Sequence, residues 1–253
     1  MKFSANLGFL WSELSLPEAI FAAKAAGFDA VECHWPYDTA FEDVKGALEE
    51  TGLNMLGLNT LRGNVEAGEN GLSAVPGREI EAREAIDQAL TYAAQIGAGA
   101  VHVMAGKTED VAARQCFIAN LTYALKQAQG QTILIEPLNA FDASGYFLKD
   151  TDQARAIIDE IDNPSLKLMF DCYHVGRTEG DVTGKLAQHL AVVGHIQFAS
   201  VPDRAAPDQG TLDYDPIFGA IAAHGWTAPL GAEYKPNGAT EDTLGWMKRW
   251  TAS

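Results

Sequence analysis

The sequence has few cysteines, few basic residues and no long apolar run. Its cysteines, Cys33, Cys116 and Cys172, are odd in number and show no C-x-x-C spacing, so we expect no disulfide framework. This usage fits a reducing environment, and we expect a cytoplasmic protein. The first residues lack the apolar segment and cleavage site of a signal peptide. No run approaches the roughly 18 apolar residues of a membrane span, so we expect no membrane partner.

Basic residues are outnumbered by acidic ones. The chain has 18 Lys and Arg against 34 Asp and Glu, which gives a formal net charge of -16. A surface of this sign repels phosphate backbones, so we expect no nucleic-acid partner. A small anionic substrate remains compatible with it, because the local charge of a pocket can oppose the overall charge of the protein.

The sequence also lacks the glycine-rich phosphate loop that an open, doubly wound sheet carries after its first strand. At that position it reads GFLWSE. Instead, short apolar segments alternate with amphipathic ones, which is typical of a closed parallel barrel. The chain is therefore predicted to form one α/β domain over residues 1–253, a (β/α)₈ TIM barrel. The predicted strands are residues 3–8, 28–32, 53–59, 100–104, 132–136, 166–171, 192–199 and 229–233.

Local signals mark the ends of several predicted helices. Ser15 and Glu18 form a capping-box pattern at the start of the first helix. Gly52 and Gly97 stand where two later helices are predicted to end, because glycine tolerates the left-handed conformation common there. Residues 60–77 show no clear element, and an irregular loop of this length is more often functional than idle.

Each of the last four predicted strands ends near an oxygen-bearing side chain. The strand ends read ILIEP, LMFDC, HIQFA and GAEYKP, and they supply Glu136, Asp171, Gln197 and Glu233. Because side chains alternate along a strand, Glu136 shares a face with Leu134. The carboxyl ends of the strands meet at one face of such a barrel, where catalytic groups lie. We therefore expect the four polar side chains to point into the barrel mouth.

These four side chains are predicted to bind a divalent metal cation. Crowded carboxylates repel one another and raise their pKa values, and a bound cation removes that conflict. Carboxylate and amide oxygens are hard ligands, which suit Mg²⁺ or Mn²⁺. One polar residue at a strand end is ordinarily a solvated loop group, but four consecutive strands with the same pattern favour the metal site.

Further polar residues near these strand ends are candidates for substrate binding. His102 and His195 share the inward phase of their strands, where each is either a hydrogen-bonded core histidine or a functional group. His174 and Arg177 closely follow the sixth strand, and together they would suit an anionic group of the substrate. For Arg177 the alternative is a surface charge paired with a nearby acid. Lys235, after the eighth strand, is equally compatible with a substrate contact and a solvated loop lysine.

A few other residues near the strand ends have structural interpretations. Phe9, Trp11 and Trp35 follow early strands and are compatible with either a pocket wall or ordinary packing. Cys172 points away from the barrel axis and is predicted to be a buried, inert thiol. Arg78, at the start of a helix, is predicted to have a structural role in pairing.

The chain resembles the hydroxypyruvate isomerase family, within the xylose-isomerase-like barrels. The resemblance extends over essentially the whole chain, and its most specific parts are the loop of residues 68–79 and the GAEYKP segment. The segments that carry it are FSANL, GFDAVE, AGENGLSAVPGRE, VHVMAGKT, LIEPLN, FDCYH, GHIQFA, GAEYKP and LGWMKRW. The resemblance implies that Glu136 and Glu233 are the catalytic acid/base pair. It also implies that these two, with Asp171 and Gln197, bind the metal.

The proteins that this chain resembles form two groups, hydroxypyruvate isomerases and 2-oxo-tetronate isomerases. LIEPLN resembles the first group, whereas VHVMAG, VPDR and the LGW ending resemble the second. The implied activity is the interconversion of hydroxypyruvate and tartronate semialdehyde (2-hydroxy-3-oxopropanoate) by enediolate proton transfer, an aldose-ketose type of isomerisation. The alternatives are a 2-oxo-tetronate isomerase and a ketose 3-epimerase of the same barrel family. The expected partner is a small hydroxy-oxo acid, and a homo-oligomer is compatible with the sequence.

Two further observations bear on this resemblance. An abasic-site nuclease shares the barrel, but it would be expected to use several histidine ligands and a basic surface, and this chain shows neither. Family members usually carry Gly-Glu-Ile-Asn after the seventh strand, whereas residues 210–213 here read Gly-Thr-Leu-Asp. The acidic group is displaced in this chain, which puts a role of that loop in substrate selection in doubt.

Overall fold

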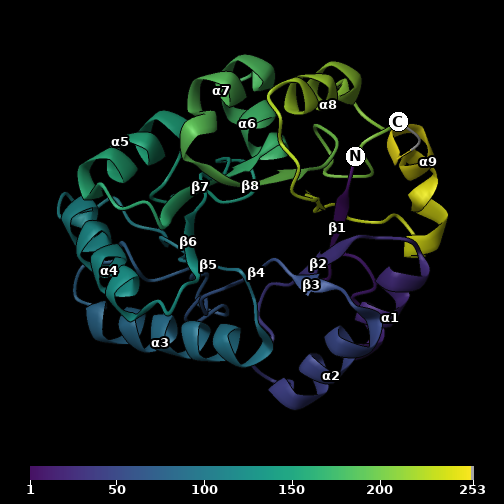
Figure 1. The fold of residues 1–253 in the computed structure, drawn as a ribbon. Coiled ribbons are helices and arrows are strands. Elements are labelled where there is room, and N and C mark those ends of the chain that lie inside the picture. The colour runs from purple at the N-terminus through teal and green to yellow at the C-terminus, as the bar shows by residue number, and fades with distance from the viewer. Residues whose placement is uncertain (252–253) are drawn as a thin grey trace.

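The structure, a computed structural model, describes residues 1–251, and within them parallel strands form a barrel surrounded by helices (Figure 1). The strands are β1 (Phe3–Asn6), β2 (Ala30–Glu32), β3 (Asn54–Met55), β4 (Gly57–Asn59), β5 (Ala100–His102), β6 (Thr132–Ile135), β7 (Leu166–Asp171), β8 (Val193–Phe198) and β9 (Leu230–Ala232). The α-helices are α1 (Leu16–Ala25), α2 (Phe41–Thr51), α3 (Glu79–Ile96), α4 (Ala113–Gln127), α5 (Thr151–Ile161), α6 (Cys172–Thr178), α7 (Val182–His189), α8 (Tyr214–Ala223) and α9 (Met247–Thr251). Two 3-10 helices are η1 (Leu190–Val192) and η2 (Thr240–Trp246).

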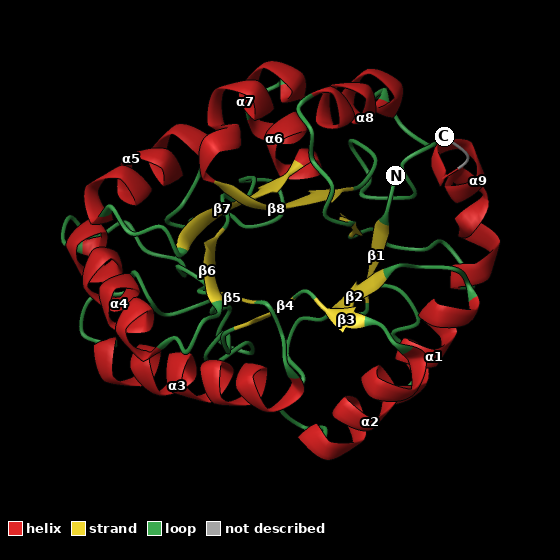
Figure 2. Ribbon diagram, viewed as in Figure 1, coloured by secondary structure: helices red, strands yellow, loops and turns green. Residues whose placement is uncertain are grey.

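The third strand of the barrel is split at Leu56, so nine segments stand where eight strands were predicted. β3 pairs with β2 and β4 pairs with β5, which places the two halves at the ends of the strand order β3-β2-β1-β9-β8-β7-β6-β5-β4. Hydrogen bonds continue across the split, because Leu56 donates to the carbonyl of Val31 and Cys33 donates to the carbonyl of Gly57. The sheet therefore closes into the predicted barrel (Figure 2).

Strand side chains alternate between the barrel interior and the layer beneath the helices, as the sequence phase predicts. Leu134 forms a small cluster with Ala100 and Met169. Its neighbours Ile133 and Ile135 belong instead to the large outer core. Buried polar side chains lie on the strands or directly after them, namely Ser4, Asn6, Glu32, His102, Glu136, Asp171, His195, Gln197 and Glu233.

Several predicted helix ends are present. The capping box of Ser15 and Glu18 opens α1, and Gly52 ends α2 with a left-handed φ of 68°. The predicted last helix begins instead as the 3-10 helix η2 and becomes α-helical only at Met247. Among the described residues, no helix combines the length and the apolar character needed to cross a membrane.

The loop of residues 60–77 is fixed to the barrel by backbone contacts. Gly71 forms a β-bridge with Ala105, and its φ is 106°. A Cβ atom at Gly71 would lie 2.7 Å from the Cβ of Met104, so only glycine fits this approach. At the end of the loop, Arg78 forms an ion pair of 2.6 Å with Glu69, in keeping with its predicted structural role.

An aromatic cluster fills the outer core where the first and last strands pair. The ring of Phe3 lies edge-on to Trp246 and Phe198, at centroid distances of 5.0 and 5.7 Å. The ring of Phe198 lies 5.2 Å from Phe218. Edge-to-face pairs of this kind add to the stability gained from burial. Because β1 and β9 pair beneath this cluster, it stabilises the seam between the two ends of the chain.

We expect Phe198→Ala to lower the free energy of unfolding by about 3–5 kcal/mol, because the fully buried ring would leave a cavity. The measurement is urea unfolding followed by circular dichroism. The control is Phe141→Ala, since Phe141 is 73% exposed and its loss should cost less than about 1 kcal/mol. Similar losses in the two variants would contradict the importance of the cluster.

Candidate active site

Four buried polar side chains meet at the carboxyl-terminal mouth of the barrel. Glu136 directly follows β6, Asp171 ends β7, and Gln197 is the penultimate residue of β8. Glu233 directly follows β9. All four are 1–5% exposed, and Asp171 pairs with Gln197 in register across adjacent strands. The structure thus brings together the four residues predicted as metal ligands.

Three oxygen atoms of this group are buried without a hydrogen-bond partner: Glu136 Oε1, Asp171 Oδ2 and Gln197 Oε1. Buried polar atoms of this kind are rare, and each costs about 1–3 kcal/mol. Oxygen atoms of Glu136 and Asp171 lie within 4.8 Å of each other, so one cation can reach both. Carboxylate and amide oxygens are the donors that a hard divalent cation prefers. The residues present therefore fit a divalent metal ion.

The carboxyl groups of the site differ in protonation. Burial, followed by the charges of Glu233 and Asp171, raises the pKa of Glu136 well above its usual range. Burial also raises the pKa of Asp171 to about 7, although Arg204 opposes this shift. Burial acts against the charge of Glu233 too, but Arg204 and His34 hold its pKa well below the usual range. Without a cation, the surroundings therefore favour the charged form of Glu233 and the neutral form of Glu136.

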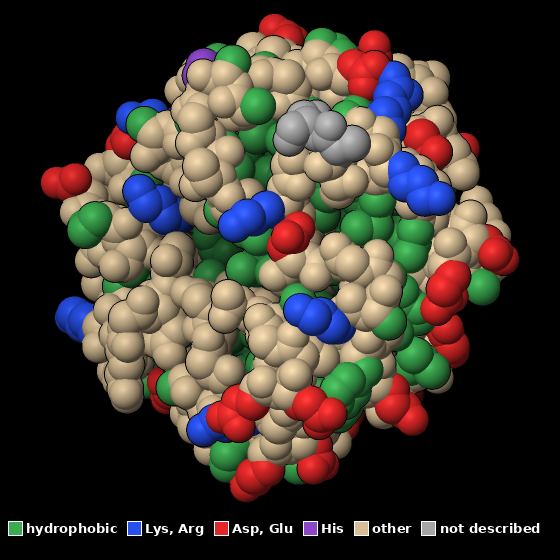
Figure 3. All heavy atoms as spheres, turned by 45° about the vertical axis from the view of Figure 1, so that its right-hand side comes forward, with side chains coloured by type: hydrophobic (Ala, Val, Ile, Leu, Met, Phe, Trp, Pro, Cys, Tyr) green, Lys and Arg blue, Asp and Glu red, His purple; other side chains and the backbone are tan. Residues whose placement is uncertain are grey.

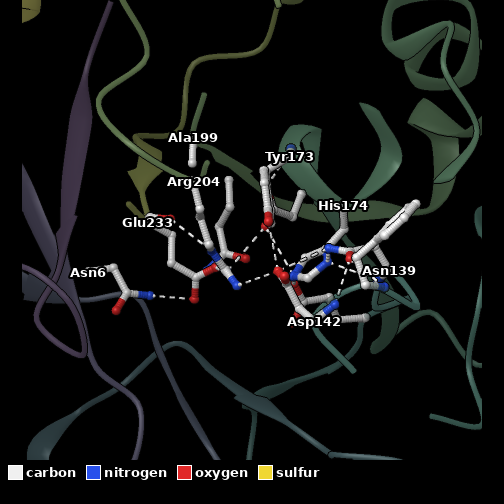
Figure 4. A network of polar contacts seen from close by, with 12 residues as sticks. Asn6, Asn139, Asp142, Tyr173, His174, Ala199, Arg204 and Glu233 are labelled. Carbon is white, nitrogen blue, oxygen red and sulfur yellow. Dashed lines mark hydrogen bonds and ion pairs between the residues drawn. The ribbon is translucent and has the colours of Figure 1, made fainter. Parts of the chain in front are cut away.

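Arg204 is the positive charge that balances these acids. It lies in the loop after β8 with a left-handed φ of 55°. Its Nη2 atom forms an ion pair with Glu233 and lies 3.5 Å from Asp171 Oδ2. Its guanidinium lies over the rings of Phe9 and Tyr173, at 4.8 and 5.0 Å from their centroids. Figure 4 shows Arg204 reaching Glu233 from this loop.

His174 enters the site because α6 begins directly at the end of β7, a helix that was not predicted. Its Nδ1 atom accepts the backbone N–H of Asn139 at 3.0 Å. An amide N–H can only donate, so the hydrogen of the neutral ring is on Nε2. That nitrogen lies 3.6 Å from Asp171 Oδ2 and 3.8 Å from Glu136 Oε1. Burial lowers the pKa of His174 to about 3, and the neutral ring therefore offers an N–H donor rather than a metal-binding lone pair.

The two inward-facing histidines have different surroundings. His102 lines the cavity, its ring nitrogens have no hydrogen-bond partner, and its Nδ1 lies 3.7 Å from Glu136 Oε2. Burial lowers the pKa of His102 to about 3, so its ring is neutral. His195 does not line the cavity, and its Nε2 lies 2.5 Å from Glu32 Oε2. The position of His102 therefore suits a substrate contact, whereas His195 is a hydrogen-bonded core histidine.

A cavity of about 160 Å³ opens over these groups. Phe9 and Trp35 form part of its wall, and Asn70 reaches it from the loop of residues 60–77. Trp11 is instead almost fully buried and packs edge-on against the ring of Phe28. Of the three aromatic residues considered from the sequence, two therefore line the site and Trp11 belongs to the core.

Two predicted substrate contacts lie outside this cavity. Arg177, on α6, stacks on the exposed ring of Phe141, with its guanidinium 4.1 Å from the centroid. Lys235 is exposed, and its backbone N–H donates to the carbonyl of Arg204 at 2.7 Å. Arg204 takes the place expected for Arg177, because the loop after β8 turns back over the barrel mouth.

Two further residues that were singled out in the sequence, Asp213 and Cys172, have structural roles. Asp213, in the stretch that departs from the family pattern, caps α8 by accepting the N–H of Asp215 at 3.0 Å. It does not line the cavity. Cys172 is fully buried in the outer core, and burial raises the pKa of its thiol, as expected for an inert cysteine.

The sequence interpretation missed several residues around the site. Asn6 and Glu32 are the last residues of β1 and β2, so the strand-end rule would have found them had it been applied to the first strands as well. His34 lies two residues beyond β2 and contacts Glu233 at 2.9 Å. Arg204 belongs to the VPDR segment, but no spacing in the sequence indicates that its loop folds back to the site.

Comparison with known proteins identifies the family. A family model described as the xylose isomerase-like TIM barrel matches residues 20–250. The chain belongs to this family. A 2-oxo-tetronate isomerase of Cupriavidus necator is 41% identical over 98% of this chain and 97% of its own length. A hydroxypyruvate isomerase of Escherichia coli is 36% identical, over 98% of each chain.

A solved structure of this xylose isomerase-like type has nearly the same fold. It is the crystal structure named "AP endonuclease, family 2" from Brucella melitensis, with a TM-score of 0.94, 34% identity and coverage of 98% of each chain. The two relatives named for isomerisation confirm the expectation that this chain is an isomerase of the family.

We expect Arg204→Ala to lower kcat/KM about 10²-fold or more, because Glu233 would lose the positively charged guanidinium that keeps it ionised. Arg177→Ala is the matched control and should change kcat/KM less than about fivefold, since Arg177 lies outside the cavity. The measurement is steady-state kinetics with the two substrates after which the relatives are named. A larger loss for Arg177→Ala than for Arg204→Ala would contradict this assignment.

Proposed function

We propose that this protein is a divalent-metal-dependent isomerase that interconverts hydroxypyruvate and tartronate semialdehyde. The observation that carries the proposal is the set of buried, unpartnered oxygens of Glu136, Asp171 and Gln197 in a site shared with the ionised Glu233. Such a site combines cation binding with two carboxyl groups whose pKa values are shifted in opposite directions. Moving a carbonyl group between adjacent carbons requires both.

Glu136, Asp171, Gln197 and Glu233 would hold the cation, and Mg²⁺ or Mn²⁺ fits their oxygen donors. When bound, the cation supplies positive charge that favours negative charge on the substrate oxygens. Both oxygens of Glu233 already accept bonds, from Asn6 and Arg204 among others. The three unpartnered oxygens therefore form the centre of the proposed ligand set.

The two glutamates would transfer the protons. Glu233 is the carboxylate that the protein itself keeps ionised, so it would take a proton from C3 of hydroxypyruvate. Glu136 lines the same cavity and would deliver a proton to C2. The C3 hydroxyl loses a proton and the C2 oxygen gains one, so the formula of the substrate does not change. In the reverse direction the two glutamates exchange roles.

Three N–H donors are placed to orient the substrate oxygens. His174 directs its Nε2 hydrogen toward the carboxylates of the site, and His102 lines the cavity as a neutral ring. Arg204 adds a guanidinium, which binds carboxylate groups well and suits an acid substrate. Phe9 and Trp35 exclude water from one side of the cavity.

A second candidate substrate is 2-oxo-tetronate, which has one more carbon. The relative from Cupriavidus necator, at 41% identity, is named for this reaction and favours it. The proposed chemistry is the same, because the carbonyl again moves between the two carbons beyond the carboxylate. The two substrates would therefore use the same glutamates and the same donors.

The charge of the protein favours a small acid over a nucleic acid, despite the name of the structure from Brucella melitensis. The formal net charge is -16. Figure 3 shows acidic side chains gathered along the lower and right-hand margins of one face, with Lys and Arg scattered and not joined in a patch. Such a face would repel a phosphate backbone.

We expect Glu136→Gln to lower kcat about 10²–10⁴-fold while the protein remains folded, because an amide neither accepts nor returns the proton. Glu84→Gln is the control, since Glu84 is exposed on α3 and does not line the cavity. It should leave kcat within about twofold. Near-normal turnover by folded Glu136→Gln would disprove the proton-transfer role.

We expect activity to disappear when the protein is treated with a chelator and then dialysed, and to return when Mg²⁺ or Mn²⁺ is added. Hydroxypyruvate and 2-oxo-tetronate should be assayed in parallel in these samples. The substrate with the higher kcat/KM identifies the reaction. Full activity with no detectable metal by elemental analysis would refute the metal requirement.

A further inference from the structure

Below the site, the buried carboxylate of Glu32 accepts hydrogen bonds from four side chains. The donors are Ser4 Oγ at 3.4 Å, Asn6 Nδ2 at 3.0 Å, His195 Nε2 at 2.5 Å and Gln197 Nε2 at 2.9 Å. Glu32 is 3% exposed and does not line the cavity over the site. It lines instead a small cavity of about 20 Å³ beside Asn6, His195 and Gln197, so its direct contacts are with these neighbours.

The most informative neighbour is Gln197, because the two ends of its amide are chemically opposite. Donors converge on both oxygens of Glu32, so both oxygens act as acceptors and only the Nε2 end of Gln197 can face them. Its Oε1 atom is then turned away from Glu32, and it is buried without a partner. Oε1 is therefore the end of the amide that is free to bind a cation.

A second connection runs through Asn6 to Glu233. The Oδ1 atom of Asn6 accepts the backbone N–H of Gly8 at 2.9 Å, which fixes the orientation of the amide. Its Nδ2 atom then donates to Glu32 Oε1 at 3.0 Å and to Glu233 Oε1 at 2.9 Å (Figure 4 shows the bond to Glu233). Glu32 therefore contacts the amide of Gln197 and also Asn6, which donates a hydrogen bond to the site carboxylate Glu233.

We propose that Glu32 is a positioning residue of the metal site, which holds Gln197 with its oxygen toward the cation and, through Asn6, fixes Glu233. This role rests on the metal site of the proposed function. Groups that orient metal ligands without touching the metal typically change its affinity about 10–100-fold when they are removed.

The packing around Gly231 supports this arrangement independently. Gly231 lies on β9, in register with Gln197. A Cβ atom at Gly231 would lie 2.6 Å from Glu32 Oε1 and 2.8 Å from Gln197 Cγ. The contact between Glu32 and Gln197 therefore occupies the space that any larger residue at 231 would need.

The first test is a double-mutant cycle in which the dissociation constant of Mn²⁺ is measured by titration calorimetry. Glu32→Gln is made in the native chain and in the Gln197→Ala variant, which has no amide to orient. A general effect of the Glu32 charge, and its effect through Asn6, are common to both backgrounds, whereas the orientation of the Gln197 amide is lost in Gln197→Ala. We expect Glu32→Gln to raise Kd at least about tenfold in the native chain and less than about threefold in Gln197→Ala. Equal increases would overturn the proposal.

The second test disturbs the contact between Glu32 and Gln197 without changing any charge. It also tests the positioning role if Glu32→Gln does not fold. Gly231→Ala should push Glu32 from Gln197 and raise the Mn²⁺ Kd several-fold. Gly57→Ala is the matched control, because a Cβ atom there meets Ala100 only at ordinary distances of 3.5 Å and beyond. An unchanged Kd in folded Gly231→Ala would overturn the proposal.

The outcomes separate this role from the proposed function on which it depends. If the native chain binds no Mn²⁺ and no Mg²⁺, the metal site itself is refuted, and the role of Glu32 falls with it. If the native chain binds Mn²⁺ and the cycle shows equal increases, the metal site stands and only the positioning role is lost.

Discussion

The ion pair between Arg204 and Glu233 is the interaction on which the chemistry of the site depends. Several carboxyl groups are buried together at the barrel mouth, and burial alone would protonate them. Arg204 compensates only part of that charge: it keeps Glu233 ionised and leaves Glu136 with a raised pKa. This uneven compensation shifts the pKa values of two carboxyl groups in opposite directions within one cavity. It also leaves unpartnered oxygens, for which a cation is the matching partner.

The polar interior of the barrel forms two levels with different roles. The upper level lines the cavity and includes Glu136, His174 and Arg204. The lower level centres on Glu32, which accepts hydrogen bonds from Asn6 and Gln197, and Asn6 also donates to Glu233 in the cavity wall. The geometry of parallel strands produces both levels, because their ends converge on one face and alternate residues point inward. Rigid strands rather than loops therefore carry most of the groups that must be placed accurately.

The xylose isomerase-like barrel accommodates differently named proteins, because a fold alone does not fix the function of a protein. Relatives with 34–41% identity include proteins named as isomerases and a structure named as an endonuclease. In this chain the site combines carboxylates, one amide oxygen and neutral histidines within an acidic protein. That combination suits a small oxo acid. The loop of residues 60–77 and the loop after β8 each add a residue to the cavity wall, and such loops are where members of one fold come to differ.

The sequence by itself determined the barrel and the four strand-end residues. Strand–helix alternation and strand phase are local properties, and they place Glu136, Asp171, Gln197 and Glu233 without knowledge of any distant contact. Only the tertiary structure decided which arginine side chain faces these acids. Arg177 is close to Asp171 in sequence but stacks on an exposed ring, whereas Arg204 arrives through a loop whose path depends on long-range contacts. Protonation was likewise decided by tertiary structure, because a pKa depends on burial and on charges that come from distant strands.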